Sequence, residues 1–135
     1  MLEQIEYQSV HCKAQETYNF HKMAAILADY GSNGLWLNND WNGADGIAIH
    51  IDGISDFKIQ LKGSISFAQK YWAKNLYIAF FEQGDLYIYP HDLILVQIEN
   101  DISDKTWLEK GTYFQTKITK RFREILEPYK VTQVI

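Results

Sequence analysis

Two stretches of strand-like sequence, each interrupted by a short turn sequence, constrain the fold of this 135-residue chain most strongly. In the first stretch, residues 44–51 and 57–61 alternate on either side of Asp52-Gly53. In the second stretch, residues 76–81 and 86–89 are short apolar and aromatic runs on either side of Gln83-Gly84-Asp85. Alternation places apolar side chains on one face of an extended strand, and short apolar runs bounded by turn residues are also typical of strands, so both stretches predict β-hairpins.

Helical periodicity precedes the first hairpin. Phe20, Met23, Leu27 and Tyr30 recur at the spacing of one helix face, which predicts a helix from about Lys13 to Tyr30. Gly31 supplies its end. The remaining expected elements are a short strand at 35–37, a turn-rich segment at 38–43, and helices at 64–74, 91–97 and 116–127.

This order of elements predicts an α/β fold of the restriction endonuclease-like type, in α-β-β-β-α-β order. A central mixed sheet would be flanked by helices. The two prolines, Pro90 and Pro128, both fall at element boundaries, and no linker or repeat divides the sequence. We therefore expect a single domain over residues 1–135.

Composition limits the environment of the chain. Apolar residues make up 47% of it, enough for a core, yet no run approaches the ~20 apolar residues of a membrane span. The polar N-terminal residues lack the apolar core of a signal peptide. The single cysteine, Cys12, cannot form an internal disulfide, so we expect a cytoplasmic protein without a membrane partner.

The net charge of −4 hides an uneven distribution. Residues 1–55 and 75–104 carry net charges of −5 and −6, whereas residues 56–74 and 105–135 carry +3 and +4. An acidic chain with such basic segments can still present a basic groove to phosphates. Alternatively, the basic residues of the last helix form an ordinary solvated face. The residues expected to hold a nucleic-acid backbone are Lys70, Lys74, Lys120 and Arg121.

One constellation of side chains points to chemistry. Asp45 opens one expected strand, and Gln60, Leu61 and Lys62 lie on the next. Alternation places Gln60 and Lys62 on one face, with Leu61 buried behind, and pairing of the two strands would bring Asp45 to Gln60. Oxygen ligands hold hard cations such as Mg²⁺ or Mn²⁺, and a lysine can act on the attacking water or on transition-state charge. This mixture suits phosphodiester hydrolysis.

Ala44-Asp45, the spacing to Gln60-Leu61-Lys62 and the order of elements resemble the PD-(D/E)XK nucleases. That superfamily includes restriction endonucleases, resolvase-type Holliday-junction nucleases and some homing endonucleases. The resemblance covers about residues 13–89. It implies metal ligation by Asp45, Gln60 and the Leu61 carbonyl, and a catalytic role for Lys62. It also implies that an acid on the first helix completes the site, for which Glu16 is the candidate.

Two positions depart from the family pattern. Ala44 replaces the motif's proline, a frequent variation. Gln60 replaces the second acidic ligand, so it offers an oxygen without charge. Some active members carry the same substitution, so weak metal binding and loss of catalysis are both open.

Other interpretations stay open beside this one. Asp45, Gln60 and Lys62 also suit a solvated strand face, and Glu16 suits a first-turn acid favoured by the helix dipole. The four histidines lack the spacing of a zinc site, and no phosphate-binding glycine motif or serine-hydrolase motif occurs.

The resemblance predicts a metal-dependent DNA endonuclease that acts as a homodimer, because so small a domain rarely encloses a duplex alone. The alternatives are a non-catalytic nuclease-fold module for nucleic-acid binding or protein assembly, and an unrelated small-molecule-binding α+β domain.

Overall fold

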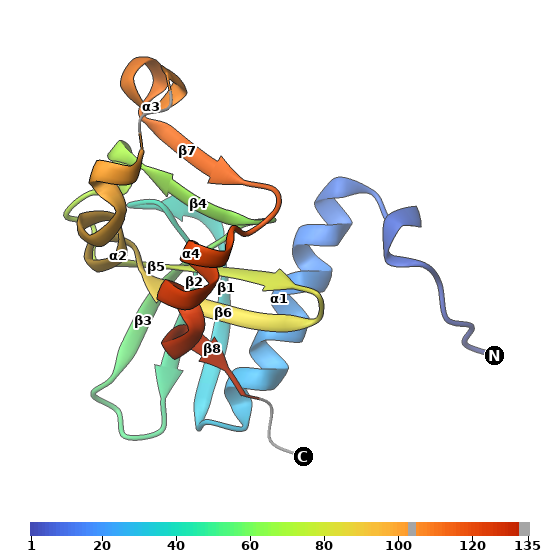
Figure 1. Ribbon diagram of the computed structural model, residues 1–135. Coiled ribbons are helices and arrows are strands. Elements are labelled where there is room, and N and C mark those ends of the chain that lie inside the picture. Colours follow the sequence, from blue (N-terminus) through green and yellow to red (C-terminus); the bar gives the residue numbers. More distant parts are fainter. Residues whose placement is uncertain (103–104, 133–135) are drawn as a thin grey trace.

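The two hairpins form the two halves of one mixed sheet (Figure 1). The structure, a computed structural model, describes residues 1–102 and 105–132. In this part of the chain the six-stranded sheet has the order β1-β2-β3-β5-β6-β8, and a second sheet pairs β4 with β7. The strands are β1 (Ser32–Trp41), β2 (Ala44–His50), β3 (Asp56–Leu61), β4 (Ile65–Ala68), β5 (Leu76–Glu82), β6 (Asp85–Pro90), β7 (Thr112–Gln115) and β8 (Lys130–Val131).

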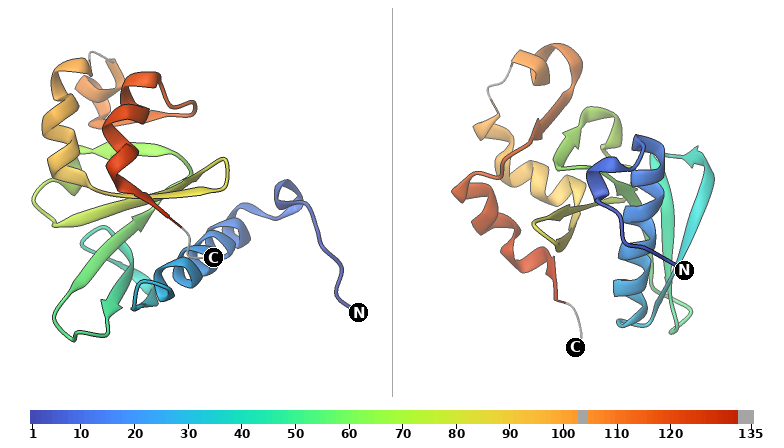
Figure 2. Two further views of the ribbon diagram at one scale, coloured as in Figure 1. Left: turned by 60° about the horizontal axis from the view of Figure 1, so that its bottom comes forward. Right: turned by 90° about the vertical axis from the view of Figure 1, so that its right-hand side faces the viewer.

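Helices cover both faces of the large sheet (Figures 1 and 2). The α-helices are α1 (Cys12–Ala28), α2 (His91–Ile98), α3 (Lys105–Lys110) and α4 (Lys120–Leu126). Single 3₁₀ turns are η1 (Tyr7–Ser9), η2 (Gln69–Tyr71), η3 (Glu99–Asp101) and η4 (Glu127–Tyr129). The predicted α/β class, a central mixed sheet flanked by helices, is thus confirmed. No helix in residues 1–102 or 105–132 is long and apolar enough to cross a membrane.

The strand pairing makes β3 and β5 the centre of the molecule. All other neighbours in the large sheet are antiparallel, but β3 and β5 run parallel. A parallel pair needs a crossover connection, and here β4 and η2 supply it. This crossover lies over the face opposite α1.

Helix α1 packs against the sheet through glycines on two strands. A Cβ on Gly46 would stand 3.0 Å from the Phe20 ring, and one on Gly34 would stand 3.1 Å from the Ala24 Cβ. The missing side chains therefore let the helix lie close to β1 and β2. The core between α1 and the sheet contains Phe20, Met23, Ile26, Ala48, Ile59, Leu61, Ala79 and Leu86.

The larger core lies on the opposite face, under β4, α2 and α4. Tyr89 is fully buried there, and its hydroxyl accepts from the Ser66 N–H at 2.9 Å and donates to the Ser66 carbonyl at 2.6 Å. Burial raises the pKa of Tyr89 far above its usual value, so the phenol stays protonated as a donor. These bonds fix the crossover strand β4 on the sheet.

The helix predicted over 64–74 is wrong. Ile65 and Phe67 are buried at alternate positions of a strand, β4, which pairs with β7. Only the single turn η2 follows it. The conformation of so short a segment depends on its partner strand and not on local periodicity. Here the partner lies some fifty residues away, as the Ile65–Gln115 pair shows.

Two other boundaries also differ from expectation. The strand expected at 35–37 is longer, because β1 pairs with β2 as far as Trp41 and leaves Asn42-Gly43 as the turn. The last helix begins at Lys120, where the Thr119 hydroxyl accepts from the Phe122 N–H, and residues 112–115 form β7. No pattern in the sequence predicts α3, β7 or β8.

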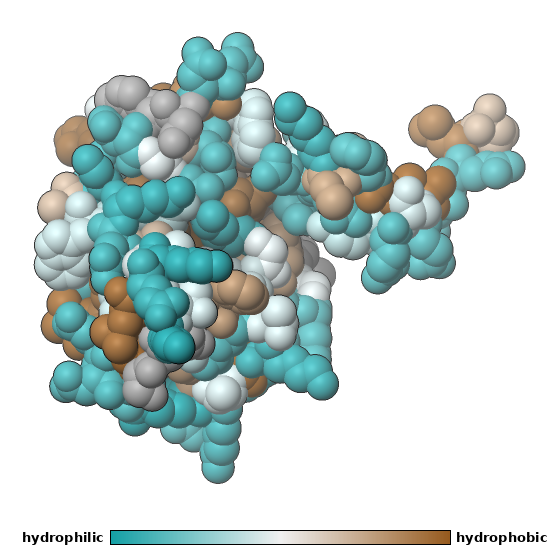
Figure 3. Space-filling view, turned by 90° about the horizontal axis from the view of Figure 1, so that it is seen from above, coloured by the Kyte–Doolittle hydropathy of each residue, from teal (hydrophilic) through white to brown (hydrophobic). Residues whose placement is uncertain are grey.

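The chain before α1 forms an arm that stands away from the body (Figures 1 and 2). Figure 3 shows apolar side chains at the end of this arm, beside a mostly hydrophilic body. Met1, Leu2 and Ile5 are among the most exposed apolar residues described. Tyr7 attaches the arm to α1, because its hydroxyl accepts from Asn19 Nδ2 at 2.8 Å and its carbonyl accepts from Gln15 Nε2 at 3.1 Å.

Candidate functional site

Strand pairing brings Asp45 to the end of β3. The antiparallel register pairs Gly46 with Ile59, and one further step along it sets Asp45 opposite Gln60. The Leu61 N–H donates to Asp45 Oδ2 at 2.9 Å. The predicted approach of these two strand ends is therefore present.

The backbone of Leu61 points toward Asp45, whereas its side chain is buried beneath α1 as expected. The next residue, Lys62, donates its N–H to the Ala79 carbonyl on β5 at 2.9 Å. Since alternate residues of a strand direct their backbone groups to opposite neighbours, the N–H and the carbonyl of Leu61 both face β2. The carbonyl oxygen thus lies on the same side of β3 as the Asp45 carboxylate.

Lys62 is half-buried, and its ammonium is placed by an aromatic ring. Lys62 Nζ lies 5.5 Å from the centroid of the Tyr71 ring, and Lys70 Nζ lies 5.4 Å from the same centroid. Tyr71 itself is buried in the core on the face opposite α1. Cation–π attraction therefore holds two positive charges beside the face that carries Gln60.

A buried histidine supports this ring. His91 Nε2 accepts from the Ala68 N–H at 3.1 Å, and Nδ1 lies 2.8 Å from Asp92 Oδ1. Because Nε2 is an acceptor, the ring proton is on Nδ1, which donates to Asp92. The imidazole also packs edge-on against Tyr71, at 5.6 Å between centroids. Asp92 Oδ2 accepts from the Ala73 N–H at 2.9 Å, so His91 and Asp92 bind both sides of η2.

Burial lowers the pKa of His91, and the neighbouring Asp92 opposes only part of that shift. We predict that the His91 ring stays neutral as the pH falls below 6.5, where an unfolded histidine takes up a proton. The unfolded chain then binds more protons than the folded one, so folding stability should decrease by up to about 1.4 kcal/mol per pH unit until His91 itself titrates. NMR titration of the His91 ring checks this, and a midpoint at or above 6.5 would contradict it.

Glu16 is exposed on the first part of α1. One turn later Phe20 packs on Gly46, and Ala24 packs on Gly34, which pairs with Ala48. The N-terminal part of α1 therefore runs toward the end of β2 that carries Asp45. Among the described residues, Glu16 makes no hydrogen bond or ion pair with Asp45, Gln60 or Lys62.

The basic residues expected to hold a nucleic-acid backbone fall into two groups. Lys70 and Lys74 lie in and just after η2, beside Tyr71. Lys120 and Arg121 begin α4. Arg121 binds Asp101, with Nε at 3.0 Å and NH2 at 2.8 Å from Oδ2, so this carboxylate offsets its charge. Only the first group adjoins Lys62.

The donor atoms around Asp45 suit a hard cation. A carboxylate, the Gln60 amide oxygen and the Leu61 carbonyl are the oxygen types that Mg²⁺ accepts, and Mg²⁺ keeps several waters besides. Within residues 1–102 and 105–132, no three His, Cys, Asp or Glu side chains are grouped so that they could hold a metal. The set therefore fits Mg²⁺ in atom type but carries little negative charge.

Comparison with known proteins adds one structural likeness. No family model and no curated protein matches the chain. Among solved structures, the chain is similar to a bacterial homing endonuclease, I-Ssp6803I, with 15% sequence identity and a TM-score of 0.44. The match covers 89% of this chain and 95% of that one. At this TM-score, nothing about fold or function follows from the likeness.

The supporting role of His91 is not predicted by the sequence pattern. Its only local signal is the sequence Pro-His-Asp at the start of a helix, which is typical of a helix boundary. The partner that makes His91 important, the Ala68 N–H, lies 23 residues away.

Proposed function

We propose that this chain is a metal-dependent DNA endonuclease of the PD-(D/E)XK type. The observation that carries the proposal is the strand register that sets Asp45 opposite Gln60, with Lys62 two residues further along the chain. The Leu61 N–H orients the carboxylate, and Tyr71 orients the ammonium. In this proposal Asp45, Gln60 and the Leu61 carbonyl hold Mg²⁺ or Mn²⁺.

Each residue then has a distinct task. When bound, the cation polarises the phosphate and lowers the pKa of a water. Lys62 places positive charge where the pentavalent transition state gains negative charge, and Glu16 accepts a hydrogen bond from the attacking water. The water oxygen bonds to phosphorus, the bond from phosphorus to the leaving sugar oxygen breaks, and the water's proton reaches that oxygen through solvent.

We propose a homodimer as the form that cuts both strands. A domain this small contacts one strand of a duplex at a time, and a two-fold axis would place a second site on the other strand.

Cleavage of supercoiled plasmid tests the proposed function. Purified protein with Mg²⁺ or Mn²⁺ should convert supercoiled DNA to nicked or linear forms, and chelation of the metal should stop the conversion. The Asp45→Asn variant, which keeps the shape of the side chain, should not cleave. DNA binding without cleavage under either metal would favour the alternative, a non-catalytic module.

Restoring an acid at position 60 should strengthen metal binding. We expect Gln60→Glu to bind Mn²⁺ at least about tenfold more tightly than the natural chain, because a second carboxylate adds charge to the oxygen set. Calorimetric titration measures both affinities. The matched control is Gln69→Glu, an exposed position in η2. Equal Mn²⁺ affinity for the natural chain and Gln60→Glu would remove Gln60 from the metal site.

The two groups of basic residues should contribute unequally to DNA binding. Replacing both Lys70 and Lys74 by alanine should weaken binding and reduce the salt dependence of the binding constant by about one ion per lost phosphate contact. Arg121→Ala should change the salt dependence less, because Asp101 already offsets that charge. Fluorescence anisotropy across a salt series measures both, and a larger effect of Arg121→Ala would reverse the assignment.

A further inference from the structure

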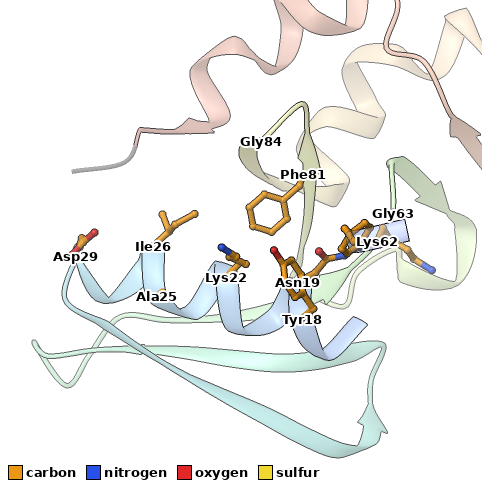
Figure 4. Close-up of a pocket in the computed structure, with 11 residues that line it drawn as sticks. Tyr18, Asn19, Lys22, Ala25, Ile26, Asp29, Lys62, Gly63, Phe81 and Gly84 are labelled. Carbon is orange, nitrogen blue, oxygen red and sulfur yellow. Dashed lines mark hydrogen bonds between the residues drawn. The ribbon is translucent and has the colours of Figure 1, made fainter. Parts of the chain in front are cut away.

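A cavity of ≈ 690 Å³ lies beside the candidate site, between α1 and the β5–β6 hairpin (Figure 4). This volume is within the range of small-ligand pockets. Residues from four separate parts of the chain line it: the η1 turn, α1, the end of β3 and the β5–β6 hairpin. They include Tyr7, Tyr18, Asn19, Lys22, Gly63 and Phe81.

The cavity and the candidate site formed by Asp45, Gln60 and Lys62 have one residue in common, Lys62. Lys62 and Gly63 form one end of the cavity wall. Figure 4 shows the Lys62 ammonium directed away from the other lining residues, and that ammonium lies over the Tyr71 ring. A phosphate bound to the Lys62 ammonium would therefore lie on the opposite side of Lys62 from the cavity.

Aromatic rings dominate the wall near this end. Tyr18 is 43% exposed, and its ring lies 5.2 Å from that of Tyr7. Phe81 reaches into the space from β5, opposite the side chains of α1 (Figure 4). Rings with accessible faces accept any nucleobase by stacking, which makes them suitable for unpaired nucleic acid.

Polar groups at the cavity suit the rest of a nucleotide. Lys22 Nζ lies 5.5 Å from the Tyr18 ring centroid on an exposed, flexible side chain, so it can move to a phosphate when a base takes its place on the ring. A Cβ built on Gly63 or Gly84 would meet no atom within 4 Å, which leaves open space beside the backbone there. Asp29, at the far end, repels phosphate and favours the Lys62 end for the sugar–phosphate chain.

From these features we propose that the cavity binds an unpaired nucleobase of the DNA strand whose phosphate lies at Lys62. The base stacks on Tyr18 and Phe81, and Lys22 pairs with a phosphate of the same strand. This inference rests on the proposed function. It specifies the substrate class as DNA with a single-stranded segment next to the cut, because a base inside a duplex does not expose its face.

Photocrosslinking tests the location of the base. A duplex with a single-stranded overhang that contains 5-iododeoxyuridine is bound to the full chain with metal chelated, irradiated, and digested for mass spectrometry. Crosslinks should fall on Tyr18 or Phe81. Crosslinks confined to residues outside the cavity would overturn the inference, and this result needs no substituted protein.

Binding measurements test the energetic contribution. The natural chain should bind the overhang duplex about tenfold more tightly than a blunt duplex of the same length. Tyr18→Ala should remove most of that preference, and Phe114→Ala, which removes an exposed ring from β7, should keep it. Circular dichroism checks that each variant is folded.

The outcomes separate this inference from the proposed function. If Tyr18→Ala binds both duplexes as the natural chain does, the inference fails and the nuclease proposal stands. If the natural chain binds neither duplex, the proposed function fails, and the inference fails with it. A tighter complex with the RNA counterpart of the overhang would overturn the assignment to DNA.

Discussion

Lys62→Ala is expected to lower the rate of DNA cleavage by about 10²- to 10⁴-fold, the usual contribution of a residue that transfers a proton or stabilises transition-state charge. Lys62 is the cation at the end of β3, on the face that carries Gln60, and Tyr71 holds its ammonium at 5.5 Å from the ring centroid. The side chain is half-buried at the end of a strand, so the fold should survive its removal. Single-turnover cleavage at saturating Mg²⁺ measures the effect.

The matched control is Lys58→Ala. Lys58 lies on β3, four residues before Lys62, at a position that alternation places on the face of Gln60, and it is half-buried like Lys62. Loss of general positive charge would affect both variants similarly, whereas a catalytic role predicts a large loss only in Lys62→Ala. Cleavage that survives Lys62→Ala at the natural rate would remove this residue from the mechanism.

His91→Ala is expected to reduce the free energy of unfolding by about 3 kcal/mol. The substitution empties a fully buried site and leaves the Ala68 N–H without its acceptor. It also removes a ring that packs on Tyr71, so the support of Lys62 is weakened. Urea denaturation followed by circular dichroism measures the stability change.

An exposed histidine provides the comparison for this effect. His21→Ala on α1 should change the unfolding free energy by less than about 0.5 kcal/mol, as surface substitutions usually do. Equal losses for His21→Ala and His91→Ala would contradict the structural role given to His91.

The parts of the fold that follow from local pattern could be predicted from the sequence. Alternation identifies β2 and β3, and a period of two residues places Gln60 and Lys62 on one face. The Asp52-Gly53 turn sets the register, because Asp52 Oδ1 accepts from the N–H groups of Ile54 and Ser55 at 2.8 Å each. Those local facts suffice to bring Asp45 to Leu61.

The rest depends on contacts between distant segments. Ser66 lies in a strand because β4 pairs with the distant strand β7, and Tyr89, 23 residues later, binds the Ser66 N–H and carbonyl. No local periodicity predicts the placement of Tyr71 over Lys62, since it depends on His91 and on the crossover from β3 to β5. The cavity likewise combines Tyr7, Tyr18 and Phe81, which no short sequence motif connects.

Asp45 and Gln60 are proposed to hold a divalent cation beside Lys62. Crystals of the protein soaked in Mn²⁺ and measured at the manganese absorption edge test it most directly. An anomalous peak is expected within coordination distance of the Asp45 carboxylate, the Gln60 amide oxygen and the Leu61 carbonyl. Ordered side chains at these positions with no peak between them at saturating Mn²⁺ would contradict it.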